Sequence, residues 1–266
     1  MPARLQQAAL AAENPVPAYM ASKRRVVLVT GGTGGIGSAI CRKMADAGHT
    51  VAATYRNAEK ARRWEKEMED EGYLFCLYKC DVSDFTQCLA TAEEIASDLG
   101  PVQVLVNNAG ITRDSSLRKM TRQQWREVIS TDLDSVFNMT RAVINDMVEN
   151  KFGRIINISS INGQKGQFGQ TNYSAAKAGM HGFTKALAQE VAPKGVTVNT
   201  VSPGYVATEM IMSVAEDIRN RIKCQIPVGR FGTPEDVAHV VSFLAENNSA
   251  FITGANIAVN GGHYMD

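Results

Sequence analysis

The sequence has neither a long apolar run nor a strong charge of one sign. No stretch reaches the roughly 18 to 20 apolar residues that a bilayer-spanning helix needs. Lys and Arg number 28 and Asp and Glu number 27, so the formal net charge of the 266 residues is +1. Composition therefore gives no reason to expect nucleic acid or an anionic membrane as the main partner.

Cysteines are few, and they are not arranged for a disulfide framework or a zinc site. The five are odd in number, scattered and without a CxxC pair. Cys76 and Cys80 lie four residues apart, but no nearby histidine completes a ligand set, and the four histidines form no ligand spacing. We therefore predict free thiols in a reducing, cytoplasmic compartment, and no metal.

The first 22 residues lack the apolar core of a secretory signal. They also contain Glu13, an acid that is unusual in organelle transit peptides. We interpret 1–22 as a flexible N-terminal extension, with Met20 as an alternative start. Residues 23–266 are predicted to form a single domain, because no linker, internal repeat or low-complexity segment interrupts them.

Short β-branched runs alternate with longer helical patterns along the rest of the chain. The runs after Val26 and after Arg154 are apolar on both faces, as in buried parallel strands. The strands are expected at 24–30, 50–55, 73–80, 101–110, 153–160, 195–204 and 254–262, and the helices near 34–48, 57–72, 84–100, 121–149, 172–192, 209–223 and 234–246. This alternation predicts an α/β fold: one doubly wound Rossmann domain with a seven-stranded, mostly parallel sheet and helices on both faces.

The stretch VTGGTGGIGSAI (29–40) reads as a strand, a glycine-rich turn and the start of a helix. Such a turn lets backbone N–H groups approach a pyrophosphate at a helix N-terminus. Two patterns fit equally well: GxGxxG through Gly32, Gly34 and Gly37, and TGxxxGxG through Thr30, Gly31, Gly35 and Gly37. Directly after the first strand of a βαβ unit, either match is a strong dinucleotide-binding signal.

The end of the second predicted strand bears on the choice of cofactor. About 20 residues after the glycine turn, an acid typically binds the adenosine ribose of NAD. Here Thr54, Tyr55, Arg56 and Asn57 occupy that region, with no acid between Asp46 and Glu59. Arg56 would neutralise the 2′-phosphate of NADP, whereas an acid would repel it. NADPH/NADP⁺ is therefore the predicted cofactor.

The combination of motifs over residues 24–266 resembles the short-chain dehydrogenase/reductase family. The supporting motifs are TGGTGGIG, Asn107-Asn108-Ala109-Gly110, a Ser upstream of Tyr173-Ser-Ala-Ala-Lys177, and Pro203-Gly204 with Thr208. Within the family, NGQKGQFGQTNYS and AGITRD are most similar to NADPH-dependent acetoacetyl-CoA reductases of polyhydroxybutyrate synthesis. The 3-oxoacyl-ACP reductases of fatty acid synthesis are close behind.

The resemblance implies roles for the matching positions. At the phosphate end of the cofactor it implies Gly31, Gly32, Gly35, Ile36 and Gly37 for the pyrophosphate and Arg56 for the 2′-phosphate. Beside the adenine it implies Asp81 and Val82, and along the cofactor Asn108, Ala109 and Gly110. At the nicotinamide end it implies Tyr173 and Lys177 for the ribose, and Pro203, Gly204, Val206 and Thr208 for the nicotinamide. For the substrate it implies Asp114, Gln167, Phe168, Gln170 and Tyr205. It also implies a homotetramer.

Tyr173 and Lys177 suit the reduction of a ketone. Residues four apart share one face of a helix, so both side chains reach the same pocket. A phenol titrates near ~10, and a neighbouring ammonium lowers its pKa. Tyr173 would then be the general acid and Lys177 its tuning cation. Ser160, chosen over Ser159 by the family spacing, would donate to the substrate carbonyl.

One position departs from the family. The family usually has Asn where Asp132 begins Asp-Leu-Asp-Ser-Val-Phe, and its main-chain carbonyl is thought to hold a water of the proton relay. Asp keeps that carbonyl, but its carboxylate is able to pair with Lys177 and to weaken the effect of the lysine on Tyr173. Asp132 therefore joins the catalytic set, with turnover rate the property most affected.

The resemblance implies reduction of a short 3-oxoacyl-CoA to the (3R)-3-hydroxyacyl-CoA. One alternative substrate is a 3-oxoacyl-ACP, for which the basic residues Arg113, Arg118, Lys119, Arg122 and Arg126 near the pocket mouth would suit an acidic carrier. An alternative of another class is a weakly catalytic NADP(H)-binding protein, motivated by Asp132.

Overall fold

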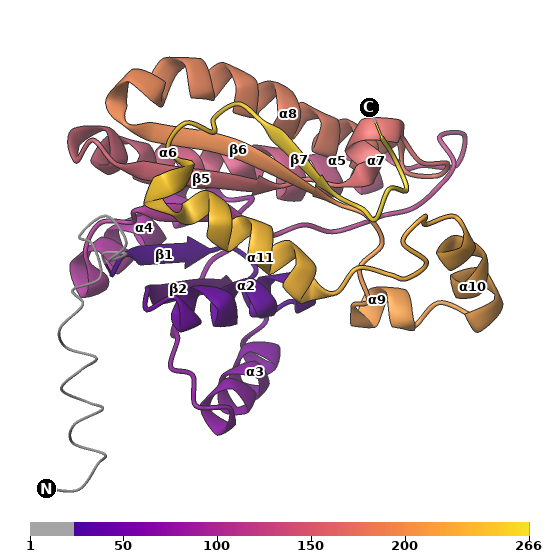
Figure 1. Cartoon of the computed structure of the whole chain (residues 1–266), viewed down its shortest axis with the longest axis horizontal. Helices are drawn as coiled ribbons and strands as arrows, with labels where there is room; N and C mark the ends of the chain where they lie inside the picture. The colour runs from indigo at the N-terminus through magenta and orange to yellow at the C-terminus, as the bar shows by residue number, and fades with distance from the viewer. Residues whose placement is uncertain (1–23, 266) are drawn as a thin grey trace, which may run out of the picture.

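A computed structural model describes residues 24–265 as a three-layer α/β domain (Figure 1). Its sheet contains β1 (Val26–Val29), β2 (Thr50–Tyr55), β3 (Cys76–Lys79), β4 (Val104–Asn107), β5 (Gly153–Ile158), β6 (Val196–Pro203) and β7 (Asn256–Val259). The strand order is β3-β2-β1-β4-β5-β6-β7, and every neighbouring pair is parallel. The predicted Rossmann architecture is confirmed.

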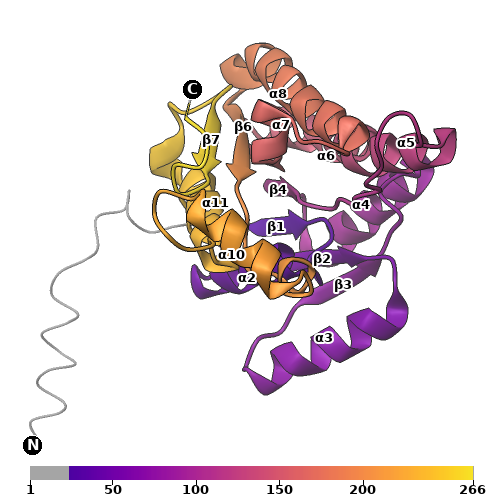
Figure 2. The same cartoon turned by 90° about the vertical axis from the view of Figure 1, so that its right-hand side faces the viewer.

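The sheet is buried on both faces because its strands carry apolar side chains on both sides. Val27 and Val29 of β1 belong to one core, and Leu28 between them belongs to the other. The first core is covered by α2 (Gly35–Asp46), α3 (Ala58–Asp70) and α11 (Pro234–Ala245), and the second by α4 (Phe85–Leu99), α6 (Ser135–Glu149) and α8 (Thr171–Val191). Figure 2 shows α2 and α11 across the sheet from α6 and α8.

The strand order reverses between β1 and β4, and this reversal positions the site. The chain leaves β1 toward β2 on one side and returns to β4 on the other. The loops after β1 and β4 therefore diverge at the carboxyl edge of the sheet, where open α/β sheets bind ligands.

The helix predicted over 121–149 is interrupted in the structure. It consists of α5 (Arg122–Ile129), a π-helical turn η1 (Ser130–Asp134) and α6. A π-helical turn contains one residue more than an α-helical turn, so it changes the direction of the side chains that follow. Such turns are frequent at functional sites. Asp132 lies within this turn and is fully buried.

Two other segments differ from the sequence prediction. The loop between Ser160 and Tyr173 contains a short helix, α7 (Ile161–Lys165), which Ser160 caps by accepting a hydrogen bond from Asn162 N at 3.1 Å. The helix predicted over 209–223 divides into α9 (Glu209–Met212) and α10 (Glu216–Cys224). The backbone leaves the helical path at 213–215, so two short helices stand beside the end of β6.

The predicted extension, residues 1–22, lies outside the described residues. Within residues 24–265, no helix is long and apolar enough to cross a membrane. The remaining described elements are two short 3₁₀ turns, η2 (Ala192–Lys194) and η3 (Asn247–Ser249).

Candidate active site

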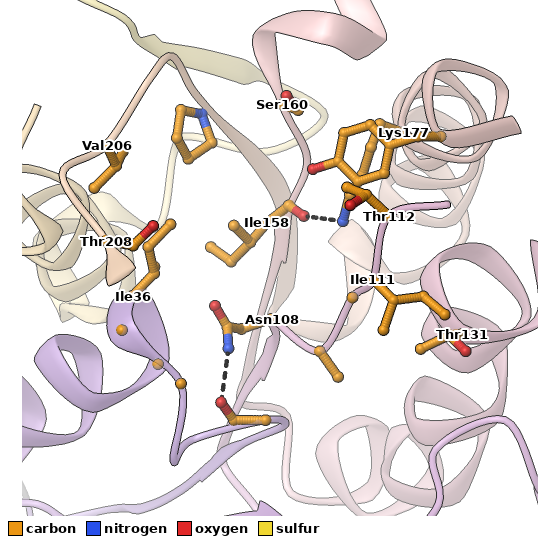
Figure 3. A pocket seen from close by; sticks show the side chains of 18 of the residues that line it. Ile36, Asn108, Ile111, Thr112, Thr131, Ile158, Ser160, Lys177, Val206 and Thr208 are labelled. Atoms are coloured by element: carbon orange, nitrogen blue, oxygen red, sulfur yellow. Dashed lines mark hydrogen bonds between the residues drawn. The ribbon is translucent and has the colours of Figure 1, made fainter. Parts of the chain in front are cut away.

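A cavity of about 820 Å³ opens at the carboxyl ends of β1, β2, β4, β5 and β6. Its wall contains most of the residues singled out from the sequence: Gly31, Gly35, Ile36, Gly37, Arg56, Asp81, Val82, Asn108, Ala109, Gly110, Ser160, Gln170, Tyr173, Lys177, Pro203, Gly204, Tyr205, Val206 and Thr208. Figure 3 shows Ile36 and Thr208 on one side of this cavity and Thr112 and Lys177 on the other. The strand order thus brings together residues that are up to 177 positions apart in the sequence, from Gly31 to Thr208.

The turn after β1 has the shape that a pyrophosphate requires. Gly31 has a positive φ of 62°, which favours glycine, and a Cβ on Gly37 would lie 2.8 Å from Asn108 Nδ2. Asn108 Nδ2 in turn donates to Thr30 O at 2.9 Å and to Gly31 O at 3.2 Å, and so holds the turn against the end of β4. Gly34 caps α2 without a side-chain hydrogen bond, so the N-terminus of the helix is left open to an anion.

Gly32 does not lie on the cavity wall. A Cβ there would meet Ala53 Cβ at 2.6 Å and Cys41 Sγ at 3.1 Å. Gly32 therefore lets the turn pack directly against β2, and its predicted cofactor contact stays a prediction.

Two cations stand at the far end of the cavity. Arg56 follows β2, and Lys60 lies in the first turn of α3; both are exposed and both line the cavity. Asn57 positions them by capping α3, since its side chain accepts from Lys60 N at 2.9 Å. Lys60 was missed by the sequence analysis, although its distance of four residues from Arg56 was a usable signal.

The side chains of Ser160, Tyr173 and Lys177 come from the segment after β5 and from α8. Lys177 is buried, and its Nζ donates to Ile158 O at 3.0 Å (Figure 3). The same Nζ lies 5.4 Å from the centre of the Tyr173 ring. Ser159 and Ser160 follow β5 and both line the cavity, but the Ser159 hydroxyl is engaged, since it donates to Lys177 O at 2.8 Å. Ser159 thus helps to hold α8 against β5.

Asp132 does not line the cavity but lies directly behind it. Its Oδ1 accepts from Ile111 N at 2.8 Å, and its Oδ2 forms an ion pair with Lys177 Nζ at 3.3 Å. The pairing that the sequence allowed is therefore present. Burial raises the pKa of the Asp132 carboxyl above its ordinary value, and Lys177 opposes that rise.

The Tyr173 phenol has competing neighbours. Burial is the largest influence and raises its pKa above the ordinary value. Lys177 lowers this pKa, as does a hydrogen bond with Ser160. The carboxylates of Asp132 and Asp114 raise it. The lysine acts in the predicted direction, but burial outweighs it in the chain alone, so the net shift is upward.

The predicted substrate residues divide into two groups. Gln170 and Tyr205 lie on the cavity wall, and Tyr205 stacks on His263 with ring centres 5.6 Å apart. Asp114 reaches the wall only through Gln170, whose Nε2 donates to Asp114 Oδ2 at 2.9 Å. Gln167 and Phe168 lie outside the wall, and Phe168 is 89% exposed. The structure therefore does not bring these last two residues into the cavity.

Other wall residues were given no role from the sequence. They include Thr54, Ile111, Thr112, Ile158 and Asn162. Asn162 Nδ2 donates to Gln170 Oε1 at 2.8 Å, so α7 extends the polar chain that continues to Asp114. The available signals were the position of Thr54 and Ile158 near the ends of predicted strands, and the place of Ile111, Thr112 and Asn162 within the motifs AGITRD and NGQKGQFGQTNYS.

Comparison with known proteins agrees with this fold. Residues 25–219 match the family described as short chain dehydrogenase, and the chain belongs to this family. It is thus an oxidoreductase of a family that uses a nicotinamide cofactor.

Several relatives of known activity cover nearly all of the chain. An acetoacetyl-CoA reductase of Rhizobium meliloti is 56% identical over 243 residues, which is 91% of this chain and 99% of the relative. The acetoacetyl-CoA reductase of Cupriavidus necator is 50% identical over 91% of this chain and 99% of the relative. A 3-oxoacyl-[acyl-carrier-protein] reductase of Pseudomonas aeruginosa is 43% identical over 92% of this chain and the whole relative.

Proposed function

We propose that this chain reduces a short 3-oxoacyl-CoA, acetoacetyl-CoA, to the (3R)-3-hydroxyacyl-CoA, as in polyhydroxybutyrate synthesis. The observation that carries the proposal is a cavity that joins Ser160, Tyr173 and Lys177 to a dinucleotide turn. Relatives that are 50 to 56% identical over nearly their full length carry the name acetoacetyl-CoA reductase.

NADPH is the proposed cofactor, and the residues present fit it. The open N-terminus of α2 and the glycine turn suit the pyrophosphate, and Arg56 with Lys60 supplies two cations for the 2′-phosphate. Lys177, Tyr173 and Asn108 would hold the nicotinamide ribose end. When bound, the reduced nicotinamide would supply a hydride to the ketone carbon.

The protein would supply a proton and an electrostatic environment. The Ser160 hydroxyl would donate a hydrogen bond to the ketone oxygen and stabilise its developing negative charge. The Tyr173 phenol would then give its proton to that oxygen, so one hydride and one proton complete the alcohol. Lys177 favours the phenolate that remains. Gln170 and Tyr205 are the proposed substrate contacts, and Asp114 would act through Gln170.

Initial rates of NADPH oxidation test this proposal. We expect turnover with acetoacetyl-CoA and NADPH, and much slower turnover with NADH. The absence of turnover with any 3-oxoacyl thioester, while NADPH still binds, would favour the weakly catalytic alternative suggested by Asp132. In that case, recovery of activity in Asp132→Asn would identify the carboxylate as the cause.

A 3-oxoacyl-ACP is the second candidate substrate. The relative from Pseudomonas aeruginosa and the basic cluster around α5, which includes Arg122 and Arg126, favour it. CoA phosphates would also suit these cations. Comparing initial rates on acetoacetyl-CoA and acetoacetyl-ACP separates the two candidates, and a strong preference for the carrier protein would overturn the first.

We also propose a cytoplasmic homotetramer. All five cysteines are free, in keeping with a reducing compartment. Phe85 of α4 and Phe137 of α6 stack at 6.0 Å and are 41% and 52% exposed, so this face offers apolar area for another subunit. Light scattering of the full chain would test the tetramer, and a monomer at micromolar concentration would contradict it.

A further inference from the structure

The ion pair between Lys177 and Asp132 differs from the others in its burial. Its side chains are 4% and 0% exposed, and Nζ and Oδ2 are 3.3 Å apart. In the other ion pairs within residues 24–265, every side chain is at least 28% exposed. A buried carboxylate must be compensated on site, because water does not screen it.

Asp132 also connects three segments of the chain. It belongs to the π-helical turn, its Oδ1 accepts from Ile111 N after β4, and its Oδ2 contacts Lys177 of α8. Gly110 leaves room for this arrangement, since a Cβ there would lie 2.7 Å from Asp132 Oδ2 and 3.3 Å from Lys177 Nζ. The carboxylate thus holds the ammonium beside the loop proposed to pack along the cofactor.

The charged groups around Tyr173 come from three elements. Lys177 is one turn along α8, Asp132 faces the lysine from the π-helical turn, and Asp114 lies on the loop after β4. Lys177 is the single cation in this set, and it forms an ion pair with the Asp132 carboxylate. We propose that Asp132 is a positioning residue that ties Lys177 to the Gly110–Ile111 backbone and offsets part of the lysine's charge at Tyr173.

The consequence is a wider pH range for reduction. Lys177 alone would favour the phenolate, and the adjacent carboxylate weakens that effect. Tyr173 therefore keeps its proton to a higher pH, and only the protonated phenol is able to supply the proton that reduction consumes. The rate of reduction falls as the pH rises through the pKa of this phenol. Asp132 shifts the pH of this fall to a higher value.

Replacing Asp132 by its neutral isostere tests this role. The amide oxygen in Asp132→Asn still accepts from Ile111 N, so the backbone contact is retained while the negative charge is lost. We expect the alkaline limb of the kcat profile for reduction with NADPH to move down by about one pH unit. The matched control is Asp134→Asn, which removes the same charge from an exposed position of the same turn.

An unmoved limb in a folded and active Asp132→Asn enzyme would overturn the proposal, as would an equal movement in Asp134→Asn. If Asp132→Asn does not fold, the wild-type chain provides the test through ¹³C NMR of the aspartate carboxyl carbons, with the Asp132 signal assigned through its contact with Ile111 N. The proposal requires the Asp132 carboxyl to be ionised over the pH range in which the enzyme reduces its substrate, because only the charged form offsets the charge of the lysine. An uncharged Asp132 carboxyl in that range would overturn it.

This inference rests on the proposed function, but the two fail differently. The NMR titration needs no substrate and no turnover. A protein with an ionised Asp132 carboxyl and no activity on 3-oxoacyl thioesters would contradict the proposed function alone, whereas an active reductase with an uncharged Asp132 carboxyl would contradict the role of Asp132.

Discussion

The two ends of the cavity carry their positive charges in opposite ways. At the proposed 2′-phosphate end, Arg56 and Lys60 are exposed, and no described ion pair includes either of them. At the catalytic end, Lys177 is 4% exposed and is paired with the fully buried Asp132. One end therefore presents free cations to solvent, and the other holds a compensated cation inside the protein.

This difference separates the recognition of the cofactor phosphate at one end from the adjustment of the catalytic ammonium's influence at the other. Exposed cations are screened by salt and gain most of their interaction energy only when a phosphate excludes water from them. A buried ammonium needs a permanent partner, and that partner then sets how strongly the ammonium influences its neighbours. Substitutions at the first end should change which cofactor binds, and substitutions at the second should change the chemistry.

Tyr173→Phe should have the largest effect, because it removes the proton donor from the catalytic end. We expect kcat for acetoacetyl-CoA reduction to fall roughly 10²- to 10⁴-fold. NADPH fluorescence titration would check that the cofactor still binds. The control is Tyr78→Phe, since that hydroxyl donates to Asp98 outside the cavity wall. Near-normal turnover in Tyr173→Phe would show that Tyr173 is not the proton donor at the catalytic end.

Arg56→Ala tests the recognition end. Loss of one charged hydrogen-bond partner should raise the KM for NADPH about 10- to 100-fold and leave the KM for NADH nearly unchanged. Lys60→Ala should act in the same sense. Arg63→Ala removes an exposed arginine of α3 that does not line the cavity, so it should alter neither value. An equal loss for NADH would mean that these cations do not recognise the 2′-phosphate.

Gly32→Ala separates packing from cofactor binding within one turn. The added methyl group would meet Ala53 Cβ at 2.6 Å, so the free energy of unfolding should fall by about 1–3 kcal/mol. Gly182→Ala has no atom within 4 Å of its new Cβ and lies in the exposed part of α8. That control should raise the free energy of unfolding by about 0.5–1 kcal/mol. Urea denaturation measures both, and no loss in Gly32→Ala would contradict the packing role.

Phe168→Ala should have the smallest effect on the folded chain. This side chain is 89% exposed, so stability should not change. An exposed aromatic ring on a loop beside the catalytic end is still suited to cover an acyl thioester, and its removal should raise the KM for acetoacetyl-CoA about fivefold. Phe251→Ala removes a fully exposed ring outside the cavity wall and serves as control. The same KM in both variants would exclude Phe168 from the substrate site.

Much of the architecture was predictable because its signals are local. Apolar β-branched runs such as β1 and β5 indicated buried parallel strands, and the glycine turn after β1 indicated a phosphate cradle. The interruptions were not predictable in this way. The π-helical turn at 130–134 and the break at 213–215 both lie within segments whose periodicity is helical, and packing against other elements decides such distortions.

The positions of the strands, the dinucleotide turn and the residue types suited to reducing a ketone can be predicted from the sequence. These follow from spacing over a few positions, which backbone geometry converts directly into shape. The folded structure brings Asp132 against Lys177, packs Gly32 on β2 and leaves Phe168 outside the cavity wall. Those outcomes depend on contacts between distant segments, where burial and charge compensation rather than local spacing select the arrangement.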